Sequence, residues 1–301
     1  MRVFVTGASG LVGSRLCREL VEEGHQVVAL SRRPQQEAHV EWVHGDVVAP
    51  GPWQDAVDGC DAVIHLAGES IADGRWSAER KKRLVASRVT SAGRIVEAIG
   101  QAKSPPRSLL SASAVGFYGP RGEEELHENS SPGEDFLSQL CVDWEAAAAK
   151  AQRHGVRVVC LRFGVVLSAR GGALKKMLPP FRLGLGGPLG PGSHWFPWVH
   201  EDDAIGIARF ALEASWAGPV NVVGREPVRM GEFARRLGRA LGRPAWLPIP
   251  LVAMRLALGE MGASLSPGQK VIPAVAEYVN YPFKHPELAG ALAACLGEET
   301  S

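Results

Sequence analysis

The sequence contains little that would suggest export, membrane insertion or metal binding. Its five cysteines are an odd number, they are widely separated, and no two of them form a Cys-x-x-Cys pair. This is not the pattern of a disulfide framework or of a cysteine-ligated zinc site. No 18 apolar residues run together, and the apolar stretch before Gly7 is too short for a signal peptide. We therefore expect a cytoplasmic protein with no membrane partner.

The chain also lacks an excess of charge of either sign. It has 33 basic and 32 acidic side chains among 301 residues, a net charge of +1. This balance argues against a polyanion-binding surface spread over the molecule, so we expect no nucleic-acid partner. The length allows one large or two modest domains with a sizeable core. Glycine (35) and proline (21) are frequent, which predicts many tight turns.

Up to about residue 163, short β-branched runs alternate with longer helical patterns, as in an α/β protein with a Rossmann-type, doubly wound parallel sheet. The predicted strands are Arg2 to Thr6, Gln26 to Leu30, Val40 to Val43, Ala62 to Leu66, Ser108 to Ala112 and Arg157 to Leu161. Between the fourth and fifth we predict one helix, with an apolar face made by Val85, Val89, Ala92, Val96 and Ile99. A dinucleotide-binding domain over 1–170, with 196–225 returning to it, is the domain organisation that this pattern predicts.

The second half begins with a stretch rich in glycine and proline, from Gly171 to Gly192. A segment of this length without regular structure is usually a binding loop or a lid. Helices are predicted at 203–213 and 230–241, a strand at 220–223, and a mostly helical tail over 251–296. We expect 171–195 and 226–301 to form a substrate or lid region with a small C-terminal domain.

A glycine-rich turn follows the first predicted strand directly and opens a helix. In this context Gly7 allows a tight turn, Gly10 lets the backbone approach a pyrophosphate, and Gly13 lets helix and strand pack closely. Leu11 and Val12 complete the loop. The alternative is a purely structural turn. We predict that this loop binds a dinucleotide.

The end of the second strand predicts which dinucleotide binds. An NAD-preferring site carries an acidic residue there for the ribose hydroxyl, whereas this chain has Ser31 and Arg32, followed by Arg33. Guanidinium groups suit a 2′-phosphate because they form charge-assisted, bidentate hydrogen bonds. NADP(H) is therefore the predicted cofactor. The other interpretation is that one or both arginines are simply solvated.

Several motifs together resemble the extended, atypical short-chain dehydrogenase/reductases, and the resemblance covers essentially the whole chain. Within that superfamily, the chain is similar to the NAD(P)-dependent epimerase/dehydratase-like subfamily with a small extra C-terminal domain. The motifs are Thr6 to Gly13, Gly45-Asp46, Asp61 to Gly68, Ser111 to Gly119, Trp198 to Asp203, and the Pro-Pro-Phe-Arg-Leu-Gly-Leu-Gly-Gly-Pro block at Pro179 to Pro188.

This resemblance implies further cofactor contacts. Arg88, together with Ser87, would face the cofactor, and Asp46 would lie near the adenine. Leu66, Ala67 and Gly68 would line the cofactor beyond its pyrophosphate, and Val165 and Val166 would flank the nicotinamide. The alternative for the apolar members is plain core packing. Extended relatives often dimerise through helices beside the sheet, so a homodimer is an open expectation.

One departure from the superfamily affects the chemistry. The resemblance implies a Tyr-x-x-x-Lys pair after the fifth strand, and none of the three tyrosines here has that spacing to a lysine. The candidates left for proton transfer are Ser113, which resembles the superfamily's active-site serine, and Tyr118, whose alternative role is to close a turn.

His200 is a further acid candidate, although histidine in this motif more often orients a strand end, with Asp202 or Asp203 as helix N-cap. No carboxylate or cysteine has metal-ligand spacing with His194 or His200, so no metal is expected.

Two functions follow from these observations. The first is an NADP(H)-dependent oxidoreductase or nucleotide-sugar epimerase-like enzyme that acts on a small carbonyl or sugar-type substrate. The second is a non-catalytic NADPH-binding sensor or regulatory protein. The missing tyrosine–lysine pair favours the sensor, whereas the glycine-rich segment and the polar residues near Ser113 favour the enzyme.

Overall fold

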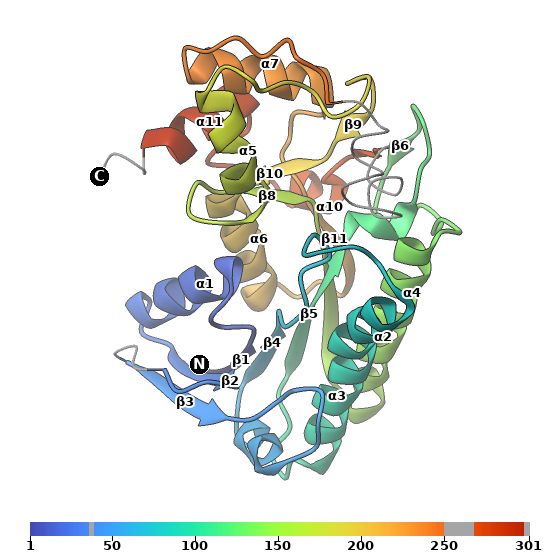
Figure 1. Ribbon diagram of the computed structural model, residues 1–301. Helices are drawn as coiled ribbons and strands as arrows, with labels where there is room; N and C mark the ends of the chain where they lie inside the picture. Colours follow the sequence, from blue (N-terminus) through green and yellow to red (C-terminus); the bar gives the residue numbers. More distant parts are fainter. Residues whose placement is uncertain (36–38, 250–267, 298–301) are drawn as a thin grey trace.

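The computed structural model describes residues 1–35, 39–249 and 268–297. A seven-stranded sheet lies at its centre, and every neighbouring pair of strands in it is parallel. The order is β11-β7-β5-β4-β1-β2-β3, so the chain winds outward in both directions from β1 (Figure 1). The strands are β1 (Arg2–Thr6), β2 (Gln26–Ser31), β3 (Val40–His44), β4 (Ala62–His65), β5 (Ser108–Ala114), β7 (Arg157–Phe163) and β11 (Gly218–Val222).

Both faces of this sheet are covered by helices, which explains why its strands are almost continuously apolar. Val3 and Val5 face one core, shared with α1 (Leu11–Glu22) and α6 (Glu201–Glu213). The intervening Phe4 faces the opposite core, shared with α3 (Ser91–Gln101) and the short 3₁₀ helices η1 (Pro52–Val57) and η4 (Lys150–His154); α4 (Phe136–Ala149) packs on α3 and β5. The predicted α/β Rossmann-type fold is confirmed. The six predicted strands all form, and their ends differ from the prediction by at most two residues.

Besides the two cores that flank the sheet, a separate hydrophobic core lies beyond the carboxyl ends of the strands, at the top of Figure 1. It is called the second core below. It is built from α5 (Gly172–Arg182), α7 (Met230–Ala240) and α11 (Leu288–Gly297), which pack on β8 (Val165–Leu167) and β10 (Trp198–His200). The remaining elements are α2 (Ala78–Val85), the 3₁₀ turn η3 (Val115–Tyr118), α10 (Ala274–Tyr278), and two short strand pairs, β9 (Trp195–Phe196) with β12 (Val228–Arg229) and β6 (Glu125–Leu126) with β13 (Lys270–Val271). The domain boundaries given above stay a prediction.

The prediction of an irregular segment over Gly171 to Gly192 is wrong in its first half, because α5 forms there despite Pro179 and Pro180. Leu174, Leu178 and Phe181 recur at helical spacing and are buried in the second core. An interior proline costs a helix about 3 kcal/mol, whereas each buried large apolar side chain contributes about 1.5–3 kcal/mol. Burial of this apolar face therefore prevails over the two backbone hydrogen bonds that Pro179 and Pro180 cannot donate.

The single helix predicted around Val85 to Ile99 is also corrected. A five-residue π-helical turn, η2 (Ala86–Thr90), separates α2 from α3. Val85 is consequently exposed, while Ala92, Val96 and Ile99 are buried as expected. Of the predicted helical tail over 251–296, residues 251–267 lie outside the described residues. Among the helices that the structure describes, none has the length and apolar character of a membrane span.

Candidate cofactor and substrate site

The turn between β1 and α1 has the geometry of a phosphate cradle. Gly7 has φ +73°, a conformation that favours glycine, and Gly10 caps α1 with no side-chain hydrogen bond. A Cβ atom on Gly13 would lie 2.2 Å from the Gly7 carbonyl oxygen, so the helix packs too closely on the turn for any side chain at this position. The first turn of α1 contains no acidic residue. Its free backbone N–H groups and the positive end of the helix dipole are therefore available to an anion.

The carboxyl end of β2 places Ser31 and Arg32 at the same edge of the sheet. The Ser31 hydroxyl donates to the Arg33 carbonyl oxygen at 2.8 Å and accepts the Arg33 N–H at 3.2 Å, which fixes the turn. Arg32 is exposed in this turn. Asp46, just after β3, is also exposed, and its carboxylate accepts the Val48 N–H at 3.1 Å. Among the described residues that end β2, Ser31 to Arg33, no side chain is acidic, which fits a 2′-phosphate.

The end of β4 continues the cradle toward the middle of the sheet. A Cβ atom on Gly7 would lie 2.6 Å from the Leu66 carbonyl carbon, so the first turn rests on Leu66 and Ala67. Gly68, which follows, is exposed, and a Cβ atom there would lie 3.6 Å from the Arg88 guanidinium carbon. These residues thus form one surface with the phosphate loop.

The π turn aims Arg88 at this surface. Its guanidinium donates to the Glu69 carbonyl oxygen at 3.0 Å and lies 5.2 Å from the Trp144 ring. Ser87 accepts the Glu69 N–H at 3.2 Å, so both residues of the pair hold the segment after β4. π turns inside helices are frequent at functional sites. Helical periodicity gave no signal for this one.

Ser113 lies at the carboxyl end of β5 in a buried polar network. Its hydroxyl donates to Glu145 Oε1 at 2.6 Å, and Arg162 donates to both oxygens of the same carboxylate at 2.8 Å. Burial lowers the pKa of Arg162, but the hydrogen bond and charge of Glu145 outweigh it, so the net shift is upward. Ser113 is 3% exposed, and the Glu145 side chain is 14% exposed. Glu145 and Arg162 belong to this candidate site, and the sequence analysis did not identify either of them.

Tyr118 belongs to the same network, but it lies in the core. Its side chain has no exposed surface, and its hydroxyl donates to Asn221 Oδ1 at 2.6 Å while accepting from Arg162 at 2.9 Å. Burial raises the pKa of Tyr118 to about 12. In this conformation the tyrosine closes a turn, and its proton is not available to a ligand at the carboxyl edge of the sheet.

Cys141 and Glu145 lie four residues apart on α4, in the segment where the superfamily pattern places its tyrosine and lysine. The Cys141 thiol contacts Ser113, and burial, followed by the charge of Glu145, raises the pKa of this thiol to about 12. Thus the thiol stays protonated at neutral pH. A proton donor of the usual kind is replaced here by a thiol and a carboxylate.

Val165 and Val166 lie in β8, which is paired with β10 in parallel register and follows directly after β7. Both are half-buried, and Val166 also packs against the main core. They therefore lie next to the carboxyl edge of the sheet on the side of β7. Their contact with a nicotinamide stays a prediction.

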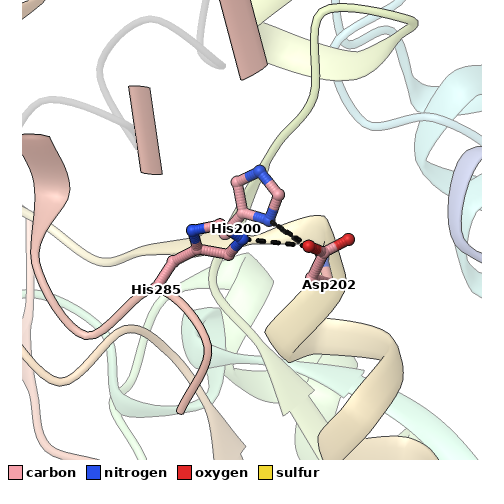
Figure 2. Close-up of side chains that lie close together, drawn as sticks. All are labelled: His200, Asp202 and His285. Carbon is pink, nitrogen blue, oxygen red and sulfur yellow. Dashed lines mark hydrogen bonds and ion pairs between the residues drawn. The ribbon is translucent and has the colours of Figure 1, made fainter. Parts of the chain in front are cut away.

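His200, Asp202 and His285 bring their ligand atoms within 4.8 Å of one another at the start of α6 (Figure 2). The N-cap of α6 is His200, whose Nδ1 accepts the Asp202 N–H at 3.1 Å, so the predicted caps Asp202 and Asp203 are wrong. The imidazole takes the place of a hydroxyl or carboxylate cap because it is fully buried and neutral. Burial lowers the pKa of His200 to about 4.

Asp202 is paired with basic side chains. Lys284 Nζ lies 2.6 Å and His285 Nε2 2.9 Å from Asp202 Oδ2, and Arg15 pairs with the other oxygen. Burial would raise the pKa of Asp202, but these hydrogen bonds and charges hold it well below its usual range. This arrangement joins α1 and α6 to the segment before α11, and both oxygens of Asp202 already have basic partners in it.

Comparison with known proteins adds to this geometry. The model of the NAD dependent epimerase/dehydratase family matches residues 3–224, and a domain of unknown function (DUF1731) matches residues 249–295. An Arabidopsis thaliana protein named "Epimerase family protein SDR39U1 homolog, chloroplastic" is 40% identical over 98% of this chain and 87% of its own. The cytoplasmic location of this chain stays a prediction.

Two solved structures cover 99% of the chain. Human epimerase family protein SDR39U1 (isoform 2), solved with NADPH, has a TM-score of 0.90 and 37% identity over 99% of its own chain. A nucleoside-diphosphate sugar epimerase from Corynebacterium glutamicum has a TM-score of 0.80 and 33% identity over 58% of its chain. The likeness therefore includes the second core as well as the central sheet.

Proposed function

This chain belongs to the NAD dependent epimerase/dehydratase family, and from this premise we propose that it is an NADP(H)-dependent oxidoreductase with a small-molecule substrate. The observation that carries the proposal is the cradle between β1 and α1, in which Gly7, Gly10 and Gly13 leave a helix N-terminus open to a pyrophosphate. When bound, the cofactor supplies or accepts a hydride. An epimerase-like reaction uses the same hydride transfer, so it is a more specific version of this proposal.

Two observations favour the phosphorylated cofactor. Arg32 is exposed at the end of β2, and no acidic residue is there to bind a ribose 2′-hydroxyl. The human relative was solved with NADPH. We assign the 2′-phosphate to Ser31 and Arg32.

The other residues of this edge bind the remainder of the cofactor or the substrate. Asp46 lies toward the adenine, and Arg88 lies beyond the pyrophosphate. The middle of the cofactor is lined by Leu66, Ala67 and Gly68. Its nicotinamide is flanked by Val165 and Val166. Backbone N–H groups at the helix start come from Leu11 and Val12. Ser113 contacts the substrate, and Tyr118 supports the network behind it.

A fluorescence titration with NADPH and NADH tests the cofactor assignment. The unmodified protein should bind NADPH more tightly, and Arg32→Ala should weaken NADPH about 10- to 100-fold while NADH changes little, because one charge-assisted bond is lost. Arg18→Ala, which removes an exposed arginine from the middle of α1, serves as the matched control and should bind both cofactors normally. Equal affinities of the unmodified protein for NADPH and NADH would refute the assignment.

A non-catalytic NADPH sensor is the second candidate function. The burial of Tyr118 favours it, because that hydroxyl cannot protonate a ligand at the carboxyl edge of the sheet. In this case the cofactor would bind as described, but no substrate would be converted.

A further inference from the structure

The hydroxyl of Ser113 has a fixed direction. It donates to Glu145 Oε1 at 2.6 Å, and Arg162 fixes the position of this carboxylate by donating to both of its oxygens. Arg162 is itself immobilised, since its guanidinium packs 3.5 Å from the Phe117 ring centroid and donates to the Glu128 carbonyl oxygen. Rotation of the Ser113 hydroxyl away from Glu145 would break a charge-assisted hydrogen bond.

With its proton committed to Glu145, Ser113 offers only lone pairs to a ligand. Glu145, whose side chain reaches the surface, is also only an acceptor as a carboxylate. The superfamily pattern has two donors in this region, a tyrosine and a lysine, whereas this chain has Cys141 and Glu145. At Ser113 and Glu145 the site therefore offers hydrogen-bond acceptors, whereas the superfamily pattern has donors.

We propose that Glu145 is a positioning residue that makes Ser113 a hydrogen-bond acceptor, so that the substrate must donate an O–H or N–H group at its reacting carbon. The inference rests on the proposed function, because it assumes that this carbon lies beside a nicotinamide. Alcohols and amines meet the requirement. The carbonyl oxygen of an aldehyde or ketone would find no donor on Ser113 or Glu145 and would lose its hydrogen bonds to water.

The same arrangement gives a balanced route for oxidation of an alcohol. The substrate C–H bond breaks, and its hydrogen leaves with the electron pair to NADP⁺, which is reduced to NADPH. The O–H proton passes to Ser113 Oγ as the Ser113 proton passes to Glu145, and the carbonyl double bond forms. Water then removes the proton from Glu145. An amine loses its C–H hydrogen and N–H proton in the same way.

Binding measurements test this polarity without relying on turnover. The full chain is loaded with 1,4,5,6-tetrahydro-NADP, which cannot transfer hydride, and the affinities of cyclohexanol, cyclohexylamine and cyclohexanone are compared by ligand-observed NMR. Either donor probe, or both, should bind at least about tenfold more tightly than the ketone. The alcohol and amine arms show which donor the site prefers.

Three variants separate positioning from a merely structural role. Ser113→Ala should abolish the preference for donors. Glu145→Gln should reduce it to within about twofold, because an amide can itself donate to Ser113 and release the serine hydroxyl. Ser111→Ala, on the same strand and equally buried, should keep the full preference.

Several results would overturn the proposal. These are a ketone that binds as tightly as both donors, a preference that survives in Ser113→Ala, or failure of both donors to bind the loaded protein. A parallel titration with NADPH distinguishes this failure from that of the proposed function. If NADPH binds but the preference is absent, only the polarity inference fails.

Discussion

Arg162 is the residue around which the polar interior is organised. It holds Glu145, Tyr118 and the Glu128 carbonyl oxygen at once, while its guanidinium covers the Phe117 ring. A buried network of this kind is stable only when each member keeps its partner, because an unpaired buried polar group is costly. Substitutions in this network should therefore change the stability of the fold as well as the binding of ligands.

Removal of the Tyr118 hydroxyl should destabilise the protein. In Tyr118→Phe, Asn221 loses a donor at 2.6 Å and Arg162 loses an acceptor at 2.9 Å, so we expect a loss of about 1–3 kcal/mol in the free energy of unfolding. Urea denaturation measures it. The control Tyr278→Phe, at a tyrosine that is 88% exposed, should change stability little. Unchanged stability of Tyr118→Phe combined with lost turnover would instead place this hydroxyl on the substrate.

Two buried histidines should make stability depend on pH. Burial lowers the pKa of His65 and of His200 to about 4, and both side chains are fully buried. An unfolded histidine has a pKa of about 6.5, so between these values the unfolded chain binds protons that the folded chain does not. Their contribution is complete above about pH 6.5 and is lost as the pH falls toward 4.

At pH 5 we expect each of these histidines to reduce the free energy of unfolding by about 2 kcal/mol relative to neutral pH. Urea denaturation at pH 7.5 and 5.0 measures the difference. The double variant His65→Asn, His200→Asn should show a weaker pH dependence, even if it is less stable at neutral pH. A flat profile in the unmodified protein would contradict this account.

Among the elements, strands were predictable and irregular helices were not. The strands of the sheet are buried on both faces, so each reads as a short apolar run bounded by turn residues. The π turn at Ala86–Thr90 gave no such signal, because its cause is the fit of Ser87 and Arg88 to the segment after β4. Helix α5 was missed because local proline propensity opposed it, and tertiary burial decided the outcome.

The same distinction applies to the site. The tight turn of the glycine-rich loop could be predicted because each glycine answers a local backbone requirement. Glu145 and Arg162 could not, because they come from α4 and β7 and meet Ser113 of β5 only in the folded chain. A carboxylate four residues after Cys141 was the available signal, since it occupies the segment where a lysine is expected.

The junction of β1 and α1 predicts a strong effect of one methyl group. A Cβ atom on Gly13 would lie 2.2 Å from the Gly7 carbonyl oxygen and 2.9 Å from its carbonyl carbon, and backbone atoms cannot easily move aside. Gly13→Ala should cost about 1–3 kcal/mol of stability and weaken NADPH by more than about tenfold. Thermal unfolding and fluorescence titration measure these losses.

Gly93→Ala is the matched control for this substitution. Gly93 lies inside α3, and nothing would lie within 4 Å of its added Cβ atom. It should leave NADPH binding unchanged and stabilise the protein by up to about 1 kcal/mol. If Gly13→Ala behaved like Gly93→Ala, the loop would not be the tight cradle described here.

At the scale of the whole molecule, the proposed site lies where the central sheet meets the second core, which is built from α5, α7 and α11. The sheet presents the carboxyl ends of β1, β2, β4 and β5, while β8 and α5 connect this edge to the second core (Figure 1). Lys176 of α5 pairs with Asp73 of the segment after β4 at 2.8 Å, so the two parts also contact each other across the surface. Ligands of open α/β sheets bind at such an edge.

The central claim is that hydride passes between NADP(H) and a small molecule on this protein. We would incubate the full chain with NADPH deuterated at C4 and a pool of metabolites, and follow the label by mass spectrometry. The account predicts deuterium in a small-molecule product, formed with the unmodified protein and reduced in proportion to cofactor loss with Gly13→Ala. Tight binding of NADPH with no label leaving it, together with no reduction of NADP⁺ by the alcohols and amines of the pool, would contradict the enzyme and leave the sensor.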